Sequence, residues 1–162
     1  MCGRKTLTKG KQEIISEFLI DSWNDDFIFK PSYNIAPTNT VPIMLEKNGR
    51  NILPMKWGLI PFWSNENTYS KSKKLINARS ETLTTKSSFK NLISQNRCVV
   101  ISDGYYEWKK YGKNKIPFYI QNFDNNFLLM AGLYNIWKSK ANEKIFTYTI
   151  ITTKSNNELS FI

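Results

Sequence analysis

Hydrophobic and polar residues follow two different periods along this chain. Over residues 12–20 the apolar side chains recur three and four positions apart, which predicts a helix with one buried face, and residues 88–95 repeat that spacing. Elsewhere the apolar residues come in short runs of strand length, which cover 41–46, 51–57, 98–101, 116–121, 127–133 and 145–152. Several short strands with two or three helices predict an α+β fold that is mainly β.

Turn signals separate these runs. Asn48-Gly49 stands between the first two runs and is a strong hairpin signal, and Asp124-Asn125-Asn126 marks a turn before the run at 127–133. The polar, lysine-rich segment 64–74 predicts a solvated loop. Neither an internal repeat nor a linker interrupts the pattern, so we expect a single domain over residues 1–162.

Composition narrows the class of protein. A chain of 162 residues with 41% apolar content is large enough for a hydrophobic core. No apolar run approaches the roughly 20 residues of a membrane-spanning helix, and the N-terminus has no apolar leader, so we expect a cytoplasmic protein without a membrane partner.

Cysteine and histidine usage narrows the chemistry. The two cysteines, Cys2 and Cys98, form neither a disulfide framework nor a metal-ligand spacing, and the chain contains no histidine. We therefore expect no metal and no cofactor, and Ser-His and Cys-His catalysis is excluded. Cys98 begins an apolar strand and is expected to be a small buried hydrophobe rather than a second nucleophile.

The charge balance suggests a polyanionic partner. Twenty-three basic residues stand against 13 acidic ones, a formal net charge of +10 at pH 7. A background rich in lysine, asparagine and isoleucine can produce such an excess without selection for binding. Only four of the basic residues are arginine, whose planar fork holds a phosphate with two hydrogen bonds.

Removal of the initiator methionine would make Cys2 the N-terminal residue. Cys2 would then carry a free α-amine beside a thiol, and such a 1,2-aminothiol condenses with an aldehyde to a five-membered thiazolidine. An α-amine has a reference pKa of about 7.7–8.0, against roughly 10.4 for a lysine side chain, so a usable fraction is uncharged at neutral pH. Met-Cys alone is weak evidence, because most cysteines near a terminus have no such role.

Four further segments combine polar, aromatic and basic residues. They are Asn34-Ile35-Ala36-Pro37-Thr38, Trp57-Gly58-Leu59-Ile60-Pro61-Phe62-Trp63, Ile76-Asn77-Ala78-Arg79-Ser80-Glu81-Thr82 and Asp103-Gly104-Tyr105-Tyr106-Glu107-Trp108. Taken singly, each has an ordinary structural explanation, because tryptophans usually lie in cores, Asp-Gly in turns and a lone glutamate on a solvated strand face.

Taken in order, with Met-Cys-Gly-Arg before them, these segments resemble the SRAP family (SOS response-associated peptidase). The resemblance extends from Cys2 to about Asn156 and includes Arg97-Cys98, Pro117-Phe118-Tyr119, Ala131-Gly132-Leu133-Tyr134 and Thr152-Thr153. It implies a β-rich α+β fold around a barrel-like sheet. It also implies covalent capture of abasic sites in single-stranded DNA, in which the Cys2 amine forms a Schiff base with the sugar aldehyde and the thiol then closes a thiazolidine. The expected partner is therefore single-stranded DNA with abasic sites. Separately, we expect a monomer that is associated with the nucleoid in the cytoplasm.

The resemblance also implies residue roles. Cys2, Asn77 and Glu107 match the family's catalytic residues, where the carboxylate moves protons during imine formation and the amide hydrogen-bonds the amine or the ring. Positions that match the family's DNA contacts are Arg4 and Arg79 for phosphates, Pro61 and Trp63 for a stacked base, and Thr152 near the site.

One part of the family pattern is missing. Members carry a His-x-Arg segment after the threonine-rich strand, and by spacing its histidine would follow Ile162. We therefore expect a chain cut short of the family's C-terminal part, with consequences for catalytic rate, reversal of the crosslink and folding. Three alternatives stay open: an N-terminal-nucleophile peptidase or self-processing protein, a non-catalytic module that binds single-stranded DNA, and a nonfunctional fragment.

Overall fold

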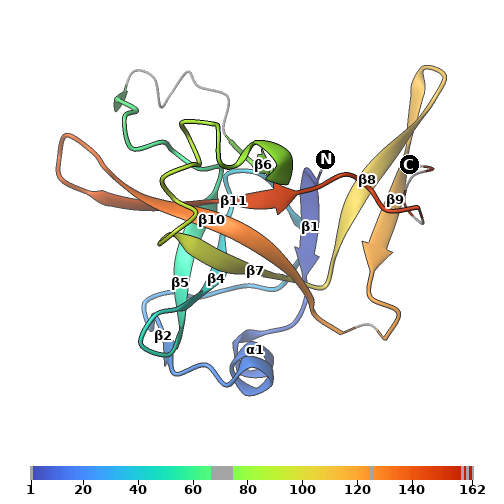
Figure 1. Cartoon of the computed structure of the whole chain (residues 1–162). Coiled ribbons are helices and arrows are strands. Elements are labelled where there is room, and N and C mark those ends of the chain that lie inside the picture. Colours follow the sequence, from blue (N-terminus) through green and yellow to red (C-terminus); the bar gives the residue numbers. More distant parts are fainter. Residues whose placement is uncertain (1, 67–74, 125, 158, 160, 162) are drawn as a thin grey trace.

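The computed structural model describes residues 2–66, 75–124, 126–157, 159 and 161 (Figure 1). Most of them lie in strands, and the helices are α1 (Lys11–Phe18) and the 3-10 turn η1 (Ser80–Thr82). The strands are β1 (Arg4–Leu7), β2 (Ser22–Trp23), β3 (Ser32–Ile35), β4 (Thr40–Glu46), β5 (Arg50–Trp57), β6 (Asn77–Arg79), β7 (Arg97–Ser102), β8 (Gly104–Tyr111), β9 (Asn114–Gln121), β10 (Leu128–Lys138) and β11 (Lys144–Thr152).

Five strands form a closed, barrel-like sheet. In the order β5-β4-β7-β10-β11, each strand runs antiparallel to the next. A parallel pairing of β11 with β5, where Tyr148 lies opposite Trp57, closes the ring. The short strands β2 and β6 extend this sheet beside β5 and β11. The expected mainly β, barrel-like α+β architecture is confirmed.

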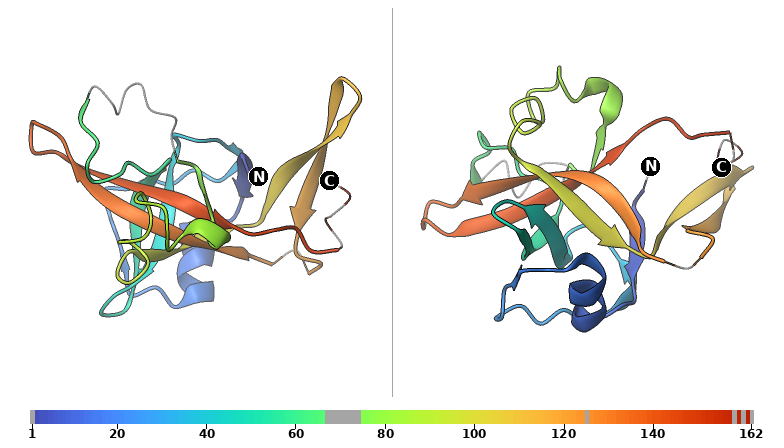
Figure 2. Two further views of the ribbon diagram at one scale, coloured as in Figure 1. Left: turned by 45° about the horizontal axis from the view of Figure 1, so that its top comes forward. Right: turned by 60° about the horizontal axis from the view of Figure 1, so that its bottom comes forward.

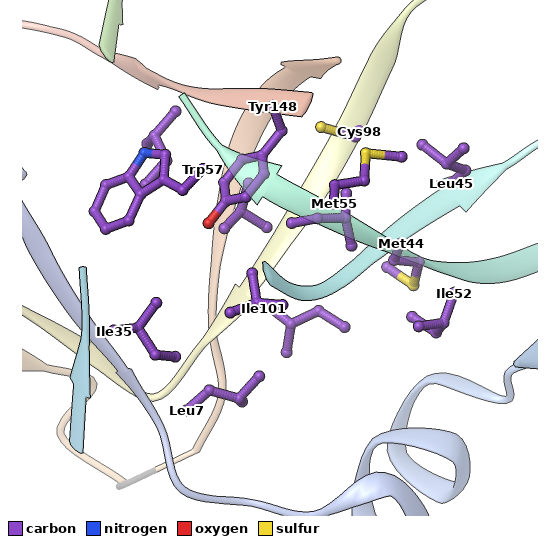
Figure 3. Packing of buried hydrophobic residues seen from close by; sticks show 14 of the residues in the cluster. Leu7, Ile35, Met44, Leu45, Ile52, Met55, Trp57, Cys98, Ile101 and Tyr148 are labelled. Carbon is purple, nitrogen blue, oxygen red and sulfur yellow. The ribbon is translucent and has the colours of Figure 1, made fainter. Parts of the chain in front are cut away.

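The barrel interior holds the core. Trp57 and Tyr148 are fully buried and stacked, with ring centroids 6.2 Å apart and planes inclined by 14°. Figure 3 shows Met55 of β5 near the Tyr148 ring, with Ile101 of β7 and Leu7 of β1 farther along the same cluster. Complete burial of an aliphatic or aromatic side chain contributes about 1.5–3 kcal/mol each, so this cluster stabilises the barrel strongly.

A second sheet leans away from the barrel. Its order is β3-β1-β8-β9, and all neighbours are antiparallel. The β8–β9 hairpin projects from the body, and the end of β1 near the N-terminus lies between the hairpin and the barrel (Figures 1 and 2). The segment after β11 crosses to the hairpin, where the rings of Phe161 and Phe118 meet edge to face at 5.5 Å.

Several predicted elements are confirmed. The helix expected at 12–20 is α1, which ends where Leu19 takes a left-handed conformation with φ 48°. The hairpin at Asn48-Gly49 joins β4 to β5, with positive φ at both turn residues as that signal requires. The strands expected at 116–121, 127–133 and 145–152 are β9, β10 and β11, and the last two share a longer ladder.

The helix predicted at 88–95 is wrong. Residues 87–95 form consecutive turns, in which the amide of Phe89 donates to Lys86 three residues back and that of Lys90 donates to the same carbonyl four residues back. Phe89 and Leu92 are nevertheless buried in a satellite cluster. Hydrogen bonds that span three and four residues alternate here in place of a continuous helical ladder, and these turns bury the same two side chains.

Some expectations fall outside the described residues. They concern residues 67–74 of the loop expected at 64–74, Asn125 of the turn before β10, and Ser160 and Ile162 of the C-terminal end. Among the helices that the structure describes, none has the length and apolarity needed to cross a membrane.

Candidate functional site

A cavity of about 610 Å³ lies between the N-terminal residues, the β8–β9 hairpin and the segment that follows β11. Cys2, the β8–β9 hairpin, β10 and the chain from Ile150 onward contribute its walls. The lining residues are Cys2, Tyr105, Glu107, Trp108, Ile120, Met130, Ile150, Ile151, Thr152, Thr153, Lys154, Ser155, Asn156 and Leu159. Cys2 and Glu107, 105 positions apart in the chain, therefore share one cavity.

Cys2 lies at the inner wall of this cavity. Its side chain is only 4% exposed, and its thiol donates a hydrogen bond to the Arg4 carbonyl, with Sγ 3.6 Å from the oxygen. Burial, reinforced by the Glu107 carboxylate, raises the pKa of the Cys2 thiol to about 11. The thiol is therefore protonated at neutral pH.

Asn77 holds the backbone of Cys2. Strand β6 runs parallel to β11, which places Asn77 opposite Ile150, and its amide nitrogen Nδ2 donates to the Cys2 carbonyl at 2.8 Å. The other amide atom, Oδ1, is buried and accepts no hydrogen bond from any described residue. A buried acceptor without a donor is costly, so Oδ1 is available to an N–H group next to residue 2.

Glu107 reaches the cavity because of strand alternation. Tyr105 and Glu107 are two residues apart on β8 and point to the same face, and Ile120 of β9 lies opposite Tyr105 on that face. Burial raises the pKa of the Tyr105 hydroxyl, and its electrostatic interactions with Cys2 and Glu107 raise it further. These three groups therefore form one electrostatic unit.

Lys5 is a buried cation that the sequence did not suggest. Its side chain is fully buried, and Nζ donates to the Ile101 carbonyl at 2.8 Å. Burial lowers the pKa of Lys5 to about 7, although the charges of Cys2 and Asp103 act in the opposite direction. A lysine beside Leu7 on an inward-facing strand is a signal for such burial, but charged residues are rarely buried, so the pattern favours an exposed side chain.

The structure brings some of the other expected residues to the cavity and leaves others away from it. Thr152 lines the cavity, and in the parallel β6–β11 pairing it lies opposite Arg79, whose side chain is exposed. Arg4, on β1, lies opposite Tyr106 of β8 and is not a lining residue. Pro61 and Trp63 follow β5 and do not line the cavity either. Trp63 is 48% exposed and packs edge to face on Phe62.

The structure also adds residues that sequence reasoning missed. Tyr105 and Trp108 flank the expected glutamate and line the same cavity, and residues 153–156 form its outer wall. The aromatic residues were visible in the Asp103–Trp108 segment, but nothing in the sequence indicated that the segment after β11 would fold over it. Among the described residues, no group of three or more His, Cys, Asp or Glu side chains is arranged to hold a metal ion.

Comparison with known proteins finds one family model and several similar sequences, and these agree with each other. Residues 1–162 match the family model for the SOS response associated peptidase, SRAP. The abasic site processing protein YoqW of Bacillus subtilis is 39% identical over 158 residues, which cover 96% of this chain and 70% of YoqW. The abasic site processing protein HMCES of Gallus gallus is 34% identical over 170 residues, which cover 86% of this chain and 51% of HMCES.

Solved structures agree. A protein from Bacteroides thetaiotaomicron superposes with a TM-score of 0.90 at 31% identity, covering 99% of this chain and 72% of that protein. A protein from Bordetella bronchiseptica has a TM-score of 0.83 at 21% identity, covers 99% of this chain and 76% of that protein, and shares the fold. Fold, ordered motifs and the match over the whole chain lead to one conclusion: the chain belongs to the SOS response associated peptidase family.

Proposed function

We propose that this protein captures abasic sites in single-stranded DNA through a covalent bond to Cys2. The observation that carries the proposal is the shared cavity, in which the residue that becomes N-terminal after loss of Met1 lies beside a carboxylate. The names of YoqW and HMCES, abasic site processing proteins, support the choice of substrate. An abasic deoxyribose opens to an aldehyde, which is the group that a 1,2-aminothiol traps.

The amine acts first. While Met1 is present, the nitrogen of Cys2 is part of a peptide bond and cannot attack, so removal of Met1 is required. The free amine then adds to C1′ of the open sugar, and loss of one water gives a protonated imine. The buried acceptor Oδ1 of Asn77, whose Nδ2 already holds the Cys2 carbonyl, is suited to accept an N–H of this amine and orient its lone pair.

The thiol acts second. With a pKa of about 11 it stays protonated at neutral pH, so it does not compete with the amine for the aldehyde carbon. Its sulfur adds to the imine carbon, the imine nitrogen becomes a secondary amine, and the thiol proton passes to a base. One aldehyde and one aminothiol thus give one thiazolidine and one water.

Glu107 is the base that the cavity offers for this proton. Its carboxylate acts electrostatically on both the Cys2 thiol and the Tyr105 hydroxyl, which indicates that it is close to both. In the earlier imine-forming step the protonated carboxyl donates a proton to the hydroxyl that leaves as water, and the carboxylate that results then accepts the thiol proton. One residue therefore serves both proton transfers.

The DNA strand on either side of the lesion requires further contacts. We assign phosphate contacts to Arg4 and Arg79, base stacking to Pro61 and Trp63, and a place beside the sugar to Thr152, which lines the cavity. The net charge of +10 supports a polyanionic substrate. A protein with this function would work wherever single-stranded DNA is exposed, which in a bacterium is the nucleoid.

A denaturing gel tests the proposal. Purified protein, shown by intact mass to lack Met1, is mixed with single-stranded DNA that carries one abasic site, and we expect a shifted band that survives denaturation. The matched DNA without the lesion should give none. Cys2→Ser should give at most a labile product, because oxygen is the poorer ring-closing nucleophile. A protein that lacks Met1, binds the DNA and forms no stable band would instead be a non-catalytic binding module.

A further inference from the structure

The second sheet has two faces, and most of its cavity-lining residues lie on one of them. Side chains directly opposite each other on antiparallel strands share a face. Tyr105, Glu107 and Ile120 point toward the cavity and the barrel. The alternate positions form what is here called the outer face, made of Arg4, Tyr106, Trp108, Lys110, Lys115, Pro117 and Tyr119.

Three aromatic rings form the middle of the outer face. The Tyr106 and Tyr119 ring centroids are 5.0 Å apart, and those of Tyr106 and Trp108 are 6.4 Å apart. Trp108 is 37% exposed and Tyr119 is 41% exposed, although the Tyr119 hydroxyl is anchored 2.9 Å from that of Thr6. The rings are thus fixed in place and partly open to solvent.

Positive charge lies at the far end of the outer face. Lys110 and Lys115 are directly opposite each other on β8 and β9, and both are exposed. Like charges in this position destabilise a hairpin, by up to about 1 kcal/mol. Residues 108–122 contain four lysines and no acidic residue, and no ion pair to either lysine occurs within the described part of the chain. The charge pattern is complementary to a polyanion.

The opposite face of the hairpin is covered. The segment after β11 packs on it through Phe161, which meets Phe118 edge to face and lies 5.1 Å below the ammonium of Lys109. Trp108 belongs to the outer face and also lines the cavity, so the two regions are continuous. A strand that leaves the cavity past Trp108 therefore arrives on the outer face.

From this geometry we infer that the outer face is a platform for single-stranded DNA beyond the lesion. Bases stack on Trp108, Tyr106 and Tyr119, and phosphates approach Lys110 and Lys115 at the hairpin end. Aromatic side chains beside lysines are the usual means of holding single strands, because every base offers a ring face whereas a duplex hides them. The choice of DNA as the polyanion rests on the proposed function. Binding of a single strand to the outer face does not depend on formation of the crosslink.

Binding to undamaged oligonucleotides tests this inference without any covalent step. The wild-type protein is titrated with single strands of about five and about fifteen nucleotides, at several salt concentrations. In the double variant Lys110→Ala/Lys115→Ala, affinity for the longer strand should fall roughly tenfold, and the slope of log K against log salt should decrease by roughly 0.7 per lost contact. Affinity for the shorter strand should change much less, because a short strand is held at the cavity alone.

The chain contains a matched control. Lys138 and Lys144 form the same kind of cross-strand lysine pair at the end of the β10–β11 hairpin, on the other side of the molecule (Figure 1). Lys138→Ala/Lys144→Ala removes the same charge and should leave the affinity for both strands unchanged. An equal loss in this control, or an equal loss on both strand lengths, would overturn the platform. Duplex DNA of the same length binding as tightly as the single strand would overturn the stacking role.

The two proposals fail separately. If wild-type protein discriminates strand length through Lys110 and Lys115 but forms no crosslink with abasic DNA, the proposed function is wrong and the platform stands. If it forms the crosslink but binds long and short undamaged strands equally, the platform is wrong and the capture chemistry stands.

Discussion

The chain buries two cysteines to nearly the same extent in very different surroundings. Cys2 is 4% exposed at the cavity wall, and Cys98 is 7% exposed in the barrel core. Burial raises the pKa of the Cys98 thiol to about 12 with no contribution from any charged group. At Cys2, burial acts together with Glu107 and against Lys5, and Asn77 holds the backbone. Cys98 is therefore surrounded by the apolar core alone, whereas Cys2 also lies near a carboxylate and a cation, the surroundings on which the proposed capture chemistry depends.

The largest effect should come from exchanging the cysteines one at a time. Cys2→Ala should abolish the stable adduct with abasic single-stranded DNA, because no sulfur remains to close the ring. Cys98→Ala should crosslink at a rate within about twofold of wild type, since its thiol lies in the core away from the cavity. Denaturing gels of both variants measure this. Loss of the adduct in a folded Cys98→Ala protein would contradict the assignment of capture to Cys2 alone.

Replacement of the Glu107 carboxylate should slow adduct formation and change the pKa of the Cys2 thiol but not that of the Cys98 thiol. Glu107→Gln should slow adduct formation by about 10²–10⁴-fold, as expected for loss of a general acid–base group. It should also lower the pKa of the Cys2 thiol below about 11, because the nearby negative charge is gone, and leave Cys98 unchanged. The pH dependence of alkylation, read for each cysteine by peptide mass spectrometry, checks both results. A Glu107→Gln variant that crosslinks at the wild-type rate would remove Glu107 from the mechanism.

The buried Lys5 near Cys2 should make the free energy of unfolding depend on pH. Burial lowers the pKa of Lys5 to about 7, so between about pH 7 and the ordinary lysine pKa of roughly 10.4 the unfolded chain binds more protons than the folded one. Burying the charged Lys5 therefore destabilises the folded protein fully below about pH 7. This destabilisation decreases as the pH rises from about 7 toward the ordinary lysine pKa. Lys5→Met should therefore raise the free energy of unfolding, and this gain should shrink by about 2 kcal/mol between about pH 7 and pH 8.5.

Urea unfolding of wild type and Lys5→Met at several pH values measures that gain. Lys9→Met is a suitable control, because the Lys9 ammonium is 4.5 Å from the Phe127 ring and 3.9 Å from Asp103 outside the core. A gain from Lys5→Met that stays constant over this range would show that Lys5 does not titrate within it.

The smallest effect concerns the core cysteine. Cys98→Ala should lower the free energy of unfolding by about 1 kcal/mol, because it removes one buried atom from a packed region. The Sγ atom fits closely there: a Cβ added at Gly132 would lie 2.8 Å from it. Urea unfolding measures the loss, and an unchanged stability would show that the thiol contributes nothing to packing.

Part of the site could be predicted from the sequence, mainly through the family resemblance. The possible N-terminal aminothiol suggested aldehyde chemistry, and the ordered motifs that resemble the SRAP family added Asn77 and Glu107. The structure brings Cys2, Asn77 and Glu107 together, while their roles stay predictions. The placement of Pro61 and Trp63 away from the cavity shows that motif order does not give distance.

Sequence patterns predicted individual elements of the fold better than the way in which those elements pack. The hairpin at Asn48-Gly49 followed from its turn residues, whereas 127–133 and 145–152 were predicted only as separate strands and their long antiparallel ladder was not. The apolar spacing at 88–95 correctly indicated two buried side chains but not how the backbone buries them. The burial of Lys5 was missed, because its local signal is weak and the burial depends on β1 lying between β3 and β8, which is a long-range pairing.

The most direct test of the account is the chemical identity of the adduct. Protein crosslinked to abasic single-stranded DNA is digested, and the peptide that begins at Cys2 is sequenced by mass spectrometry with and without borohydride treatment. We predict that the sugar is attached to Cys2 through both nitrogen and sulfur, so that borohydride leaves the mass unchanged and the thiol resists alkylation. A sugar attached to a lysine such as Lys5, or to Cys2 with its thiol still free, would contradict the thiazolidine.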